Sequence, residues 1–230
     1  MASVPFSIAG RNIEIVASLA PGVAVDGRFI AEDNAKPPDF TTLKIWLDQI
    51  DMLRFADLVE PVAADATGKF QLQAVPSGNV RVMISGTGAG NYVKEIRYNG
   101  SPLRDGIVSL DQASMTRSLT IVIDDKPASL TGEVKNGDKA VSQPYVILAK
   151  WPLAGGRVFI PTATATGSDQ GAFQFSGLAP GEYRVAALRS RVEDQERLPN
   201  TLERALAAAR KIELGPNTFQ NITIGVTEVR

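Results

Sequence analysis

Two long stretches of the chain match each other without a gap. GKFQLQAVPSGNVRV runs from Gly68 to Val82, and GAFQFSGLAPGEYRV runs from Gly171 to Val185. They share glycine, phenylalanine, glutamine, arginine and valine at matching positions, and they lie roughly the length of one small domain apart. A repeat on this scale predicts two copies of a whole β-domain, and not a solenoid of short repeats.

Other segments repeat at nearly the same spacing. VDGRF at residues 25–29 corresponds to LTGEV at 130–134, and each follows a proline, Pro21 or Pro127. These segments open the two units. The short linker around Pro127 predicts limited swivel between the units and an elongated, semi-rigid rod.

A third element occurs three times, as NIEIV at residues 12–16, SLTIV at 118–122 and NITIG at 221–225. In the two complete units it is the last strand, but the first copy has no unit in front of it. Two interpretations stay open: residues 1–20 close a domain that is absent from this chain, or they form an ordinary first strand. The predicted organisation is 1–20, an N-terminal strand; 21–125, a first β-sandwich; and 126–230, a second β-sandwich.

The first interpretation has a consequence for assembly. A closing strand without its own domain can pair with the sheet edge of another molecule. The side chains of this candidate intermolecular strand are Val4, Phe6, Ile8, Ile13 and Ile15.

Alternation of apolar and polar residues dominates the rest of the chain. It appears in TLKIWL, KFQLQ, NVRVMIS, SLTIVI, YVILA, AFQF, EYRVAA and NITIGV, with Gly, Pro, Asn and Asp clusters between the runs. Period-two alternation between frequent turns is typical of sandwiches and not of a parallel α/β sheet. The sequence therefore predicts an all-β chain of two tandem Greek-key sandwiches of transthyretin-like or immunoglobulin-like type.

One segment departs from this pattern and predicts a short helix in the second unit. LPNTLERALAAARKIEL has apolar residues at helical spacing: Leu198, Leu202, Ala205, Leu206 and Ala209. Asn200 is the expected N-cap, with Glu203 three residues further on.

The composition excludes most enzyme chemistry. The 230 residues include no Cys and no His, so the chain has no thiolate nucleophile, no Ser-His-Asp triad and no Cys or His metal ligand. The formal charge of −1 and the lack of Lys/Arg runs argue against nucleic acid and anionic membranes as partners. No apolar run approaches the roughly 18–20 residues of a membrane span, and the N-terminus does not have the pattern of a signal peptide. We expect no cofactor.

The better-preserved copy of the repeat, DQGAFQFSGLAPGEYRVAA at residues 169–187, has a structural explanation at each step. Phe173 and Phe175 alternate with polar or small residues, so both rings face one side, and Pro180-Gly181 turns the chain into the next strand. This segment resembles the signature of carboxypeptidase regulatory-like domains, in the transthyretin-like and CnaB-like group of β-sandwiches. ATGKFQLQAVPSGNVRV is a weaker version of it. The resemblance implies an accessory module without catalysis, in a fold group that includes carbohydrate-binding sandwiches.

CnaB-like relatives also form a Lys–Asn isopeptide crosslink, which needs a buried lysine, asparagine and acid together. The alternation places Lys44 and Lys135 on outward faces, and Asn221 precedes an inward isoleucine. The matching acid would fall at Ala186 or Ala187, neither of which is acidic. We therefore expect solvated lysines and no crosslink.

Carboxylates form two groups. One lies at the junction and in turns, where turn capping is favoured over a calcium site: Asp65, Asp124, Asp125 and Asp169. The other is dense in sequence, but nothing places two of its members in one cleft for acid–base catalysis: Asp48, Asp51 and Asp57. The glycine-rich GTGAGN at 86–91 precedes a strand-like run, so it lacks the helix that a phosphate-binding loop requires.

Three aromatic side chains are candidates for stacking on a glycan: Trp46, Trp151 and Tyr92. Trp46 lies on the outward face of its predicted strand, and Trp151 stands at a strand end. Burial under a loop or against the neighbouring unit is the alternative for these residues.

These features together predict a non-enzymatic, exported bacterial module of the cell surface, envelope or periplasm. Its expected role is to space, adhere or self-assemble, including into filaments, and its expected partners are protein first, either itself or other envelope proteins, and polysaccharide second. The alternatives are a carbohydrate-binding module, or an accessory domain of a larger secreted enzyme or receptor.

Overall fold

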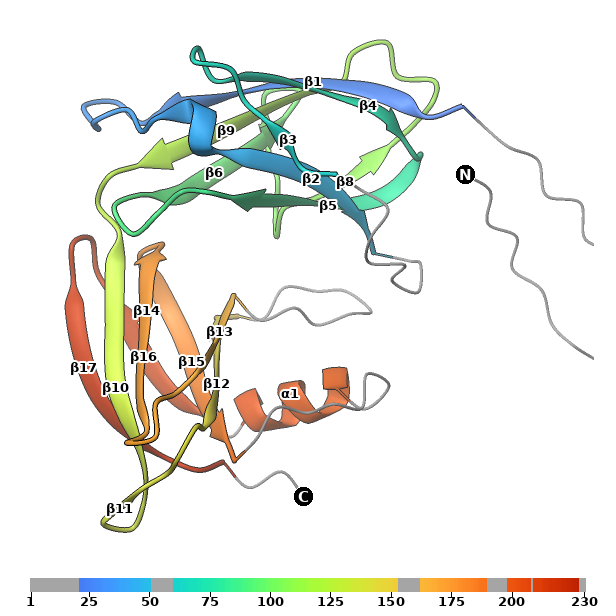
Figure 1. Ribbon diagram of the computed structural model, residues 1–230. Helices are drawn as coiled ribbons and strands as arrows, with labels where there is room; N and C mark the ends of the chain where they lie inside the picture. Colours follow the sequence, from blue (N-terminus) through green and yellow to red (C-terminus); the bar gives the residue numbers. More distant parts are fainter. Residues whose placement is uncertain (1–20, 51–59, 153–161, 190–197, 208, 228–230) are drawn as a thin grey trace, which may run out of the picture.

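Alternating β-branched, aromatic and polar residues favour extended backbone with one buried face, and most of the chain follows this pattern. The computed structural model describes residues 21–50, 60–152, 162–189, 198–207 and 209–227. Within them the regular structure is almost entirely β, with one α-helix (Figure 1). The predicted all-β sandwich class is confirmed.

The strands between Val23 and Asp124 form two sheets, which we call the N-terminal sandwich. The elements are β1 (Val23–Ala31), η1 (Phe40–Thr42, a 3-10 turn), β2 (Lys44–Gln49), β3 (Val62–Ala63), β4 (Lys69–Val75), β5 (Gly78–Ser85), β6 (Tyr92–Tyr98), β7 (Ser101–Pro102), β8 (Ile107–Leu110) and β9 (Ser118–Asp124). Sheet A has the order β4-β1-β9-β6-β7, and sheet B has the order β3-β2-β5-β8. Their facing side chains form one hydrophobic core, in which Phe29, Ile45 and Leu119 are fully buried.

The strands between Ala128 and Gly225 form two further sheets, the C-terminal sandwich, around a second core. The elements are β10 (Ala128–Asn136), β11 (Lys139–Ala140), β12 (Tyr145–Lys150), β13 (Ala163–Thr166), β14 (Ala172–Leu178), β15 (Gly181–Leu188), α1 (Leu198–Ala207), β16 (Arg210–Leu214) and β17 (Phe219–Gly225). Sheet C has the order β11-β10-β14, with β17 also paired to β10, and sheet D has the order β13-β12-β15-β16.

The strand registers show that the repeat covers both sandwiches. In the N-terminal sandwich Gly27 of β1 lies opposite Phe70 of β4 and, in parallel register, beside β9. In the C-terminal sandwich Gly132 of β10 lies opposite Phe173 of β14 and beside β17, also in parallel register. Thus β1, β4 and β9 correspond to β10, β14 and β17. The predicted opening and closing strands of the two units are confirmed.

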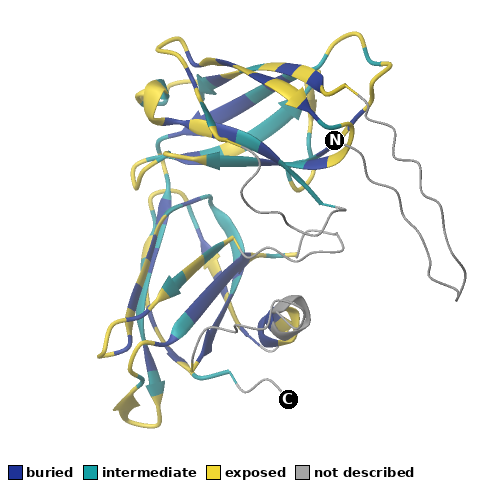
Figure 2. Cartoon of the chain, turned by 45° about the vertical axis from the view of Figure 1, so that its right-hand side comes forward, coloured by how far each residue is buried: buried dark blue, intermediate teal, exposed yellow. Residues whose placement is uncertain are grey.

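The two sandwiches differ in the segment that connects two neighbouring strands of one sheet: β5 to β8 in sheet B, and β15 to β16 in sheet D. Between β5 and β8 the chain forms β6 and β7, which extend sheet A beyond β9. At the same place in the C-terminal sandwich, α1 packs on the outside of sheet D, where Leu206 joins Ile147 and Ala186 in a small third core. Figure 2 shows buried residues on one side of this helix and exposed ones on the other. The predicted helix is confirmed, but it begins at Leu198, so the prediction of Asn200 as its N-cap is wrong.

The segment 169–187 forms a corner between two sheets. Gly171 has a φ of +74°, which glycine adopts without strain. Phe173 and Phe175 are buried, with ring centroids 5.9 Å apart. Pro180 then links β14 of sheet C to β15 of sheet D, as β4 leads to β5 in the first copy. The segment serves the fold, as the sequence predicts.

The boundaries of the domains at 21–125 and 126–230 stay a prediction, and residues 1–20 lie outside the described part of the chain. None of the described helices has the length and apolar character needed to cross a membrane.

Candidate functional site

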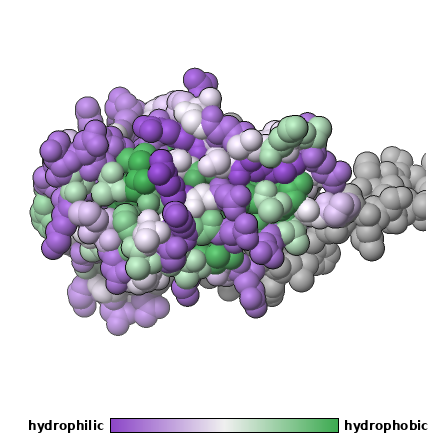
Figure 3. Space-filling view, turned by 90° about the horizontal axis from the view of Figure 1, so that it is seen from above, coloured by the Kyte–Doolittle hydropathy of each residue, from purple (hydrophilic) through white to green (hydrophobic). Residues whose placement is uncertain are grey.

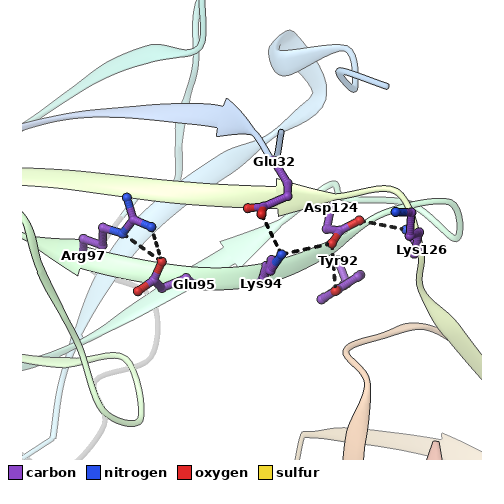
Figure 4. Close-up of polar contacts among 7 residues, drawn as sticks. All are labelled: Glu32, Tyr92, Lys94, Glu95, Arg97, Asp124 and Lys126. Carbon is purple, nitrogen blue, oxygen red and sulfur yellow. Dashed lines mark hydrogen bonds and ion pairs between the residues drawn. The ribbon is translucent and has the colours of Figure 1, made fainter. Parts of the chain in front are cut away.

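A buried carboxylate stands where the chain passes from one sandwich to the other. Asp124, the last residue of β9, is 6% exposed and is the one charged side chain that is buried among the described residues. The Tyr92 hydroxyl donates to its Oδ2 at 3.1 Å, and the Lys126 backbone N–H donates to its Oδ1 at 3.2 Å. Lys94 Nζ lies 3.6 Å from Oδ2 (Figure 4). Both carboxylate oxygens therefore have partners.

Further charged groups surround this carboxylate. Lys94 Nζ lies 2.7 Å from the carboxylate of Glu32, and the hydrogen bond to Glu32 raises the pKa of Lys94 above its usual value. On the linker itself, Asp125 Oδ2 accepts from the Lys36 backbone N–H at 2.9 Å. The linker residues 125–127 are thus tied to β9 and to the segment after β1.

The two sandwiches also touch beside the linker. A Cβ added to Gly177, near the end of β14, would lie 2.8 Å from the carbonyl oxygen of Gly88 and 3.2 Å from that of Asn91. Burial raises the pKa of Tyr183 to about 12, and the nearby Tyr92 of the other sandwich raises it as well. The GTGAGN loop therefore packs against the C-terminal sandwich. It is followed by the strand β6 and not by the helix that a phosphate-binding loop requires. It connects β5 of sheet B to β6 of sheet A and is therefore not a hairpin loop.

This cluster fixes the end of sheet A against the linker, and its groups are not arranged for catalysis. Burial, followed by the charge of Asp124, raises the pKa of Tyr92 to about 12, so its hydroxyl stays protonated and donates at neutral pH. The Asp124 carboxylate is buried and paired on both oxygens, so neither group is free to exchange a proton with a substrate. We regard the cluster of Glu32, Tyr92, Lys94, Asp124 and Lys126 as the joint between the sandwiches.

Sequence reasoning placed Asp124 and Tyr92 separately and missed their pairing. The two residues are cross-strand partners at the ends of β9 and β6, and they lie more than thirty positions apart in the chain. The signal is the register of two strands, which alternation alone does not give.

The three aromatic residues predicted for glycan stacking lie on or beside three different sheets. Trp46 is half-buried on β2 of sheet B, and Trp151 is half-buried after β12 of sheet D, with Arg184 Cζ 4.6 Å from the centre of its ring. Tyr92 opens β6 of sheet A and is 7% exposed, so its ring has no free face for a sugar. The glycan role of Tyr92 is therefore wrong, whereas that of Trp46 and Trp151 stays a prediction.

The residues considered for an isopeptide crosslink do not meet. Lys44 and Asn221 are exposed, and Lys135 Nζ lies 2.5 Å from the carboxylate of Glu133. The position of the matching acid holds buried alanines, Ala186 and Ala187. The lysines face solvent, as expected.

The two turn carboxylates differ in their partners, and Asp65 acts as a cap. Asp65 Oδ1 accepts from the backbone N–H groups of Thr67 at 2.8 Å and Lys69 at 2.9 Å, and the bond from the Thr67 hydroxyl lowers the pKa of Asp65. Asp169 Oδ1 accepts instead from a side chain, Gln143 Nε2, at 2.9 Å, and the backbone N–H groups of this turn donate to Ser168 Oγ, so the turn-capping prediction for Asp169 is wrong. Within the described ranges no three acidic groups gather into a metal site. Asp51 and Asp57, and the predicted strand residues Val4, Phe6, Ile8, Ile13 and Ile15, lie outside those ranges.

Sheet A also carries an open groove of about 740 Å³ that the sequence does not indicate. Polar residues line much of it: Asp26, Arg28, Lys69, Gln71, Ser118 and Thr120. Gln71 Nε2 already donates to Asp26 Oδ1 at 2.8 Å. Seen from above, the surface is mostly hydrophilic, with hydrophobic side chains in small separate patches (Figure 3). The groove has no arrangement that selects a ligand.

Comparison with models of known protein families gives no match, and comparison with curated proteins also gives none. Among solved structures, the chain is similar to the Bacillus anthracis TIE protein, at 12% identity and a TM-score of 0.31, over 90% of this chain but 34% of that one. It is similar to GBS52, the minor pilin of Streptococcus agalactiae, at 13% identity and a TM-score of 0.31, over 87% of this chain and 94% of that one. It is also similar to a D312A variant of BcpA, the major pilin subunit of Bacillus cereus, at 10% identity and a TM-score of 0.28, over 92% and 100% of the two chains. At these TM-scores the likenesses carry no argument about what this chain does.

Proposed function

We propose that this chain is a non-enzymatic structural module of the bacterial cell surface or envelope. In this role it holds two β-sandwiches at a fixed separation and angle, and it acts through contacts with proteins. The observation that carries the proposal is the joint around Asp124, where a buried, fully paired carboxylate stands at the exit from the N-terminal sandwich.

The joint supports a spacer because it removes the usual sources of swivel. Two units on one chain move relative to each other by default unless their interface is extensive. Here the linker 125–127 is short, its neighbours belong to strands, and its backbone is bonded on both sides: Asp124 accepts from Lys126, and Asn217 N–H donates to the Lys126 carbonyl at 3.3 Å. The contact of Gly177 with the GTGAGN loop adds a second fixed point.

A glycine–alanine exchange at equivalent positions tests the joint. Ala74 and Gly177 occupy matching places in β4 and β14, and both have positive φ, at 54° and 66°. Alanine therefore fits this conformation in the first copy, but at Gly177 its methyl would meet the carbonyl of Gly88. We expect Gly177→Ala to broaden or shift the angle between the sandwiches, and Ala74→Gly to leave it unchanged.

The angle is measured by small-angle X-ray scattering and by residual dipolar couplings on the full chain. A single orientation in the wild type, lost in Gly177→Ala, supports the spacer. A wild type that already samples a wide range of orientations contradicts it. Surface location is tested separately, by asking whether protease added to intact cells cleaves the native protein.

A further inference from the structure

The closing strand of the C-terminal sandwich is paired on one side within the described part of the chain. β17 pairs with β10 along its whole length. Its counterpart β9 pairs with β1 on one side and with β6 on the other. The C-terminal sandwich has α1 where the N-terminal sandwich has β6 and β7, so this replacement leaves β17 as the outer strand of sheet C (Figure 1).

The backbone groups on the outer side of β17 can be identified. Ser129 N–H donates to the Thr218 carbonyl at 2.8 Å, which turns the even-numbered residues of this segment towards β10. The N–H and C=O groups of the odd-numbered residues therefore point away from β10, and they belong to Phe219, Asn221, Thr223 and Gly225. Arg210 Nη1 donates to the Thr223 carbonyl at 3.0 Å, as this orientation requires.

We propose that this edge pairs with β17 of a second copy of the chain, antiparallel, with the two-fold axis at Ile222. Around this axis the odd-numbered residues face each other, as hydrogen-bonded antiparallel pairing requires. Asn221 then lies opposite Thr223 of the second copy, and Phe219 lies opposite Gly225 of the second copy. The edge is complementary to itself in one register.

Two properties of β17 favour a second copy over another partner. Its sequence, FQNITIG, has no charged side chain, so two copies meet without like-charge repulsion. Phe219 is 69% exposed, and a ring of this size opposite a glycine is the pair that the sheets already use at Gly27–Phe70 and Gly132–Phe173. Pairing would cover that ring with the partner's backbone at Gly225.

Arg210 controls access to the edge. Its bond to the Thr223 carbonyl occupies one of the acceptors that a second strand needs, and proteins commonly protect open edges with such cationic side chains. The association is therefore weak, because one added strand makes a small interface and Arg210 must first move away. Removal of the Arg210 side chain strengthens the association by roughly fivefold to tenfold, the effect of one hydrogen bond.

The test is the molar mass of the full chain by light scattering and sedimentation, over a wide range of concentrations. Thr223→Pro removes an outward N–H that β10 does not use, and Phe219→Ala removes an exposed ring without touching the core. We expect a monomer–dimer equilibrium in the wild type, a dissociation constant at least about tenfold weaker in both variants, and a tighter dimer in Arg210→Ala. Met115→Ala is the matched control, because Met115 is 95% exposed and lies outside β17.

Three results would overturn the edge pairing. One is a monomer at all concentrations in both the wild type and Arg210→Ala. The second is a dimer that Thr223→Pro and Phe219→Ala leave intact. The third is growth into larger species that deletion of residues 1–16 abolishes and Phe219→Ala does not, which would assign the contact to the N-terminal segment. The inference goes beyond the spacer role, since a rigid spacer needs no such contact and its joint is measured separately.

Discussion

The Tyr92 hydroxyl donates to Asp124 Oδ2 at 3.1 Å, where the first residue of β6 faces the last residue of β9. This bond closes the end of sheet A directly before the linker. The same carboxylate accepts from the backbone of Lys126, so one side chain connects the strand pair to the linker. The N-terminal sandwich and the start of the second sandwich are therefore coupled through two residues on strands that are distant in sequence.

Tyr92→Phe tests this coupling. It removes one donor from a buried carboxylate and leaves Lys94 as the remaining side-chain partner of Oδ2. We expect the free energy of unfolding to fall by about 1–2 kcal/mol, because a hydrogen bond to a charged group is lost in a buried site. Urea denaturation followed by Trp fluorescence measures the change.

Tyr98→Phe is the control on the same strand. The Tyr98 hydroxyl is buried and has no hydrogen-bond partner in the described residues. Its removal is expected to be neutral or slightly stabilising, because an unpaired buried hydroxyl already costs free energy. Equal losses in the two variants would show that the ring environment of β6 matters and the bond to Asp124 does not.

The paired glycines under phenylalanine rings give a second prediction. A Cβ on Gly27 would lie 2.2 Å from Cζ of Phe70 and 2.8 Å from the carbonyl oxygen of Leu119, whereas a Cβ on Gly132 would lie 2.2 Å from the carbonyl oxygen of Ile222. We expect Gly132→Ala to destabilise more than Gly27→Ala, because its strand carbonyl is closer and cannot move as a side-chain ring can. Losses of roughly 1–3 kcal/mol are expected from overpacking.

Gly90→Ala is the matched control for these substitutions. Gly90 has open space around its Cβ position and no positive φ. The change is expected to leave the midpoint of chemical denaturation within error or to raise it slightly. If Gly132→Ala proved as mild as Gly90→Ala, the close packing of β10, β14 and β17 would not be a constraint on the sequence.

Stability is expected to fall at alkaline pH. The folded pKa values of Tyr92 and Tyr183 are about 12, above the ordinary value of 10.0, chiefly because both are buried. The unfolded chain therefore loses these protons first, so the stabilisation is present in full below about pH 10 and is lost as pH rises towards 12. Each tyrosine contributes roughly 2 kcal/mol to this loss.

Absorbance titration of the four tyrosines measures the pKa values behind this loss directly. A late-titrating component of two residues is expected in the wild type, and of one residue in Tyr92→Phe. A titration in which all four tyrosines ionise together near pH 10 would argue against the buried environments of Tyr92 and Tyr183.

The sequence carries the repeat in a form that can be read directly. The Phe-x-Phe alternation of residues 173–175 and the glycines at 171 and 181 are local features, and they predict strand, turn and strand without knowledge of the partners. The closing strands at 118–122 and 221–225 are found for the same reason. Local pattern determines these elements because each buries one face of a period-two segment.

Features that depend on the partner strand are not visible in this way. The segments that follow β5 and β15 differ, one forming β6 and the other α1, and the pattern gives each element but not its place on the sheets. Whether β9 or β17 has a second neighbour is therefore decided by topology. The pairing of Tyr92 with Asp124 and the left-handed Ala74 arise from the same non-local source.

The contact of α1 with sheet D gives a final prediction. Ile147 of β12 and Trp46 of β2 occupy equivalent places on the outer faces of sheets D and B, but only sheet D is covered by the helix. Ile147 lies opposite Ala186 in β15, as Trp46 lies opposite Met83 in β5. Ile147 is fully buried in a cluster with Leu206 of α1, whereas Trp46 is half-buried. Ile147→Ala and Leu206→Ala are each expected to cost about 2–4 kcal/mol in urea denaturation, and the double variant to cost less than their sum, because both open the same contact. Trp46→Ala combined with Leu206→Ala should instead be additive, and a coupling there as large as that between Ile147 and Leu206 would refute the assignment of α1 to sheet D.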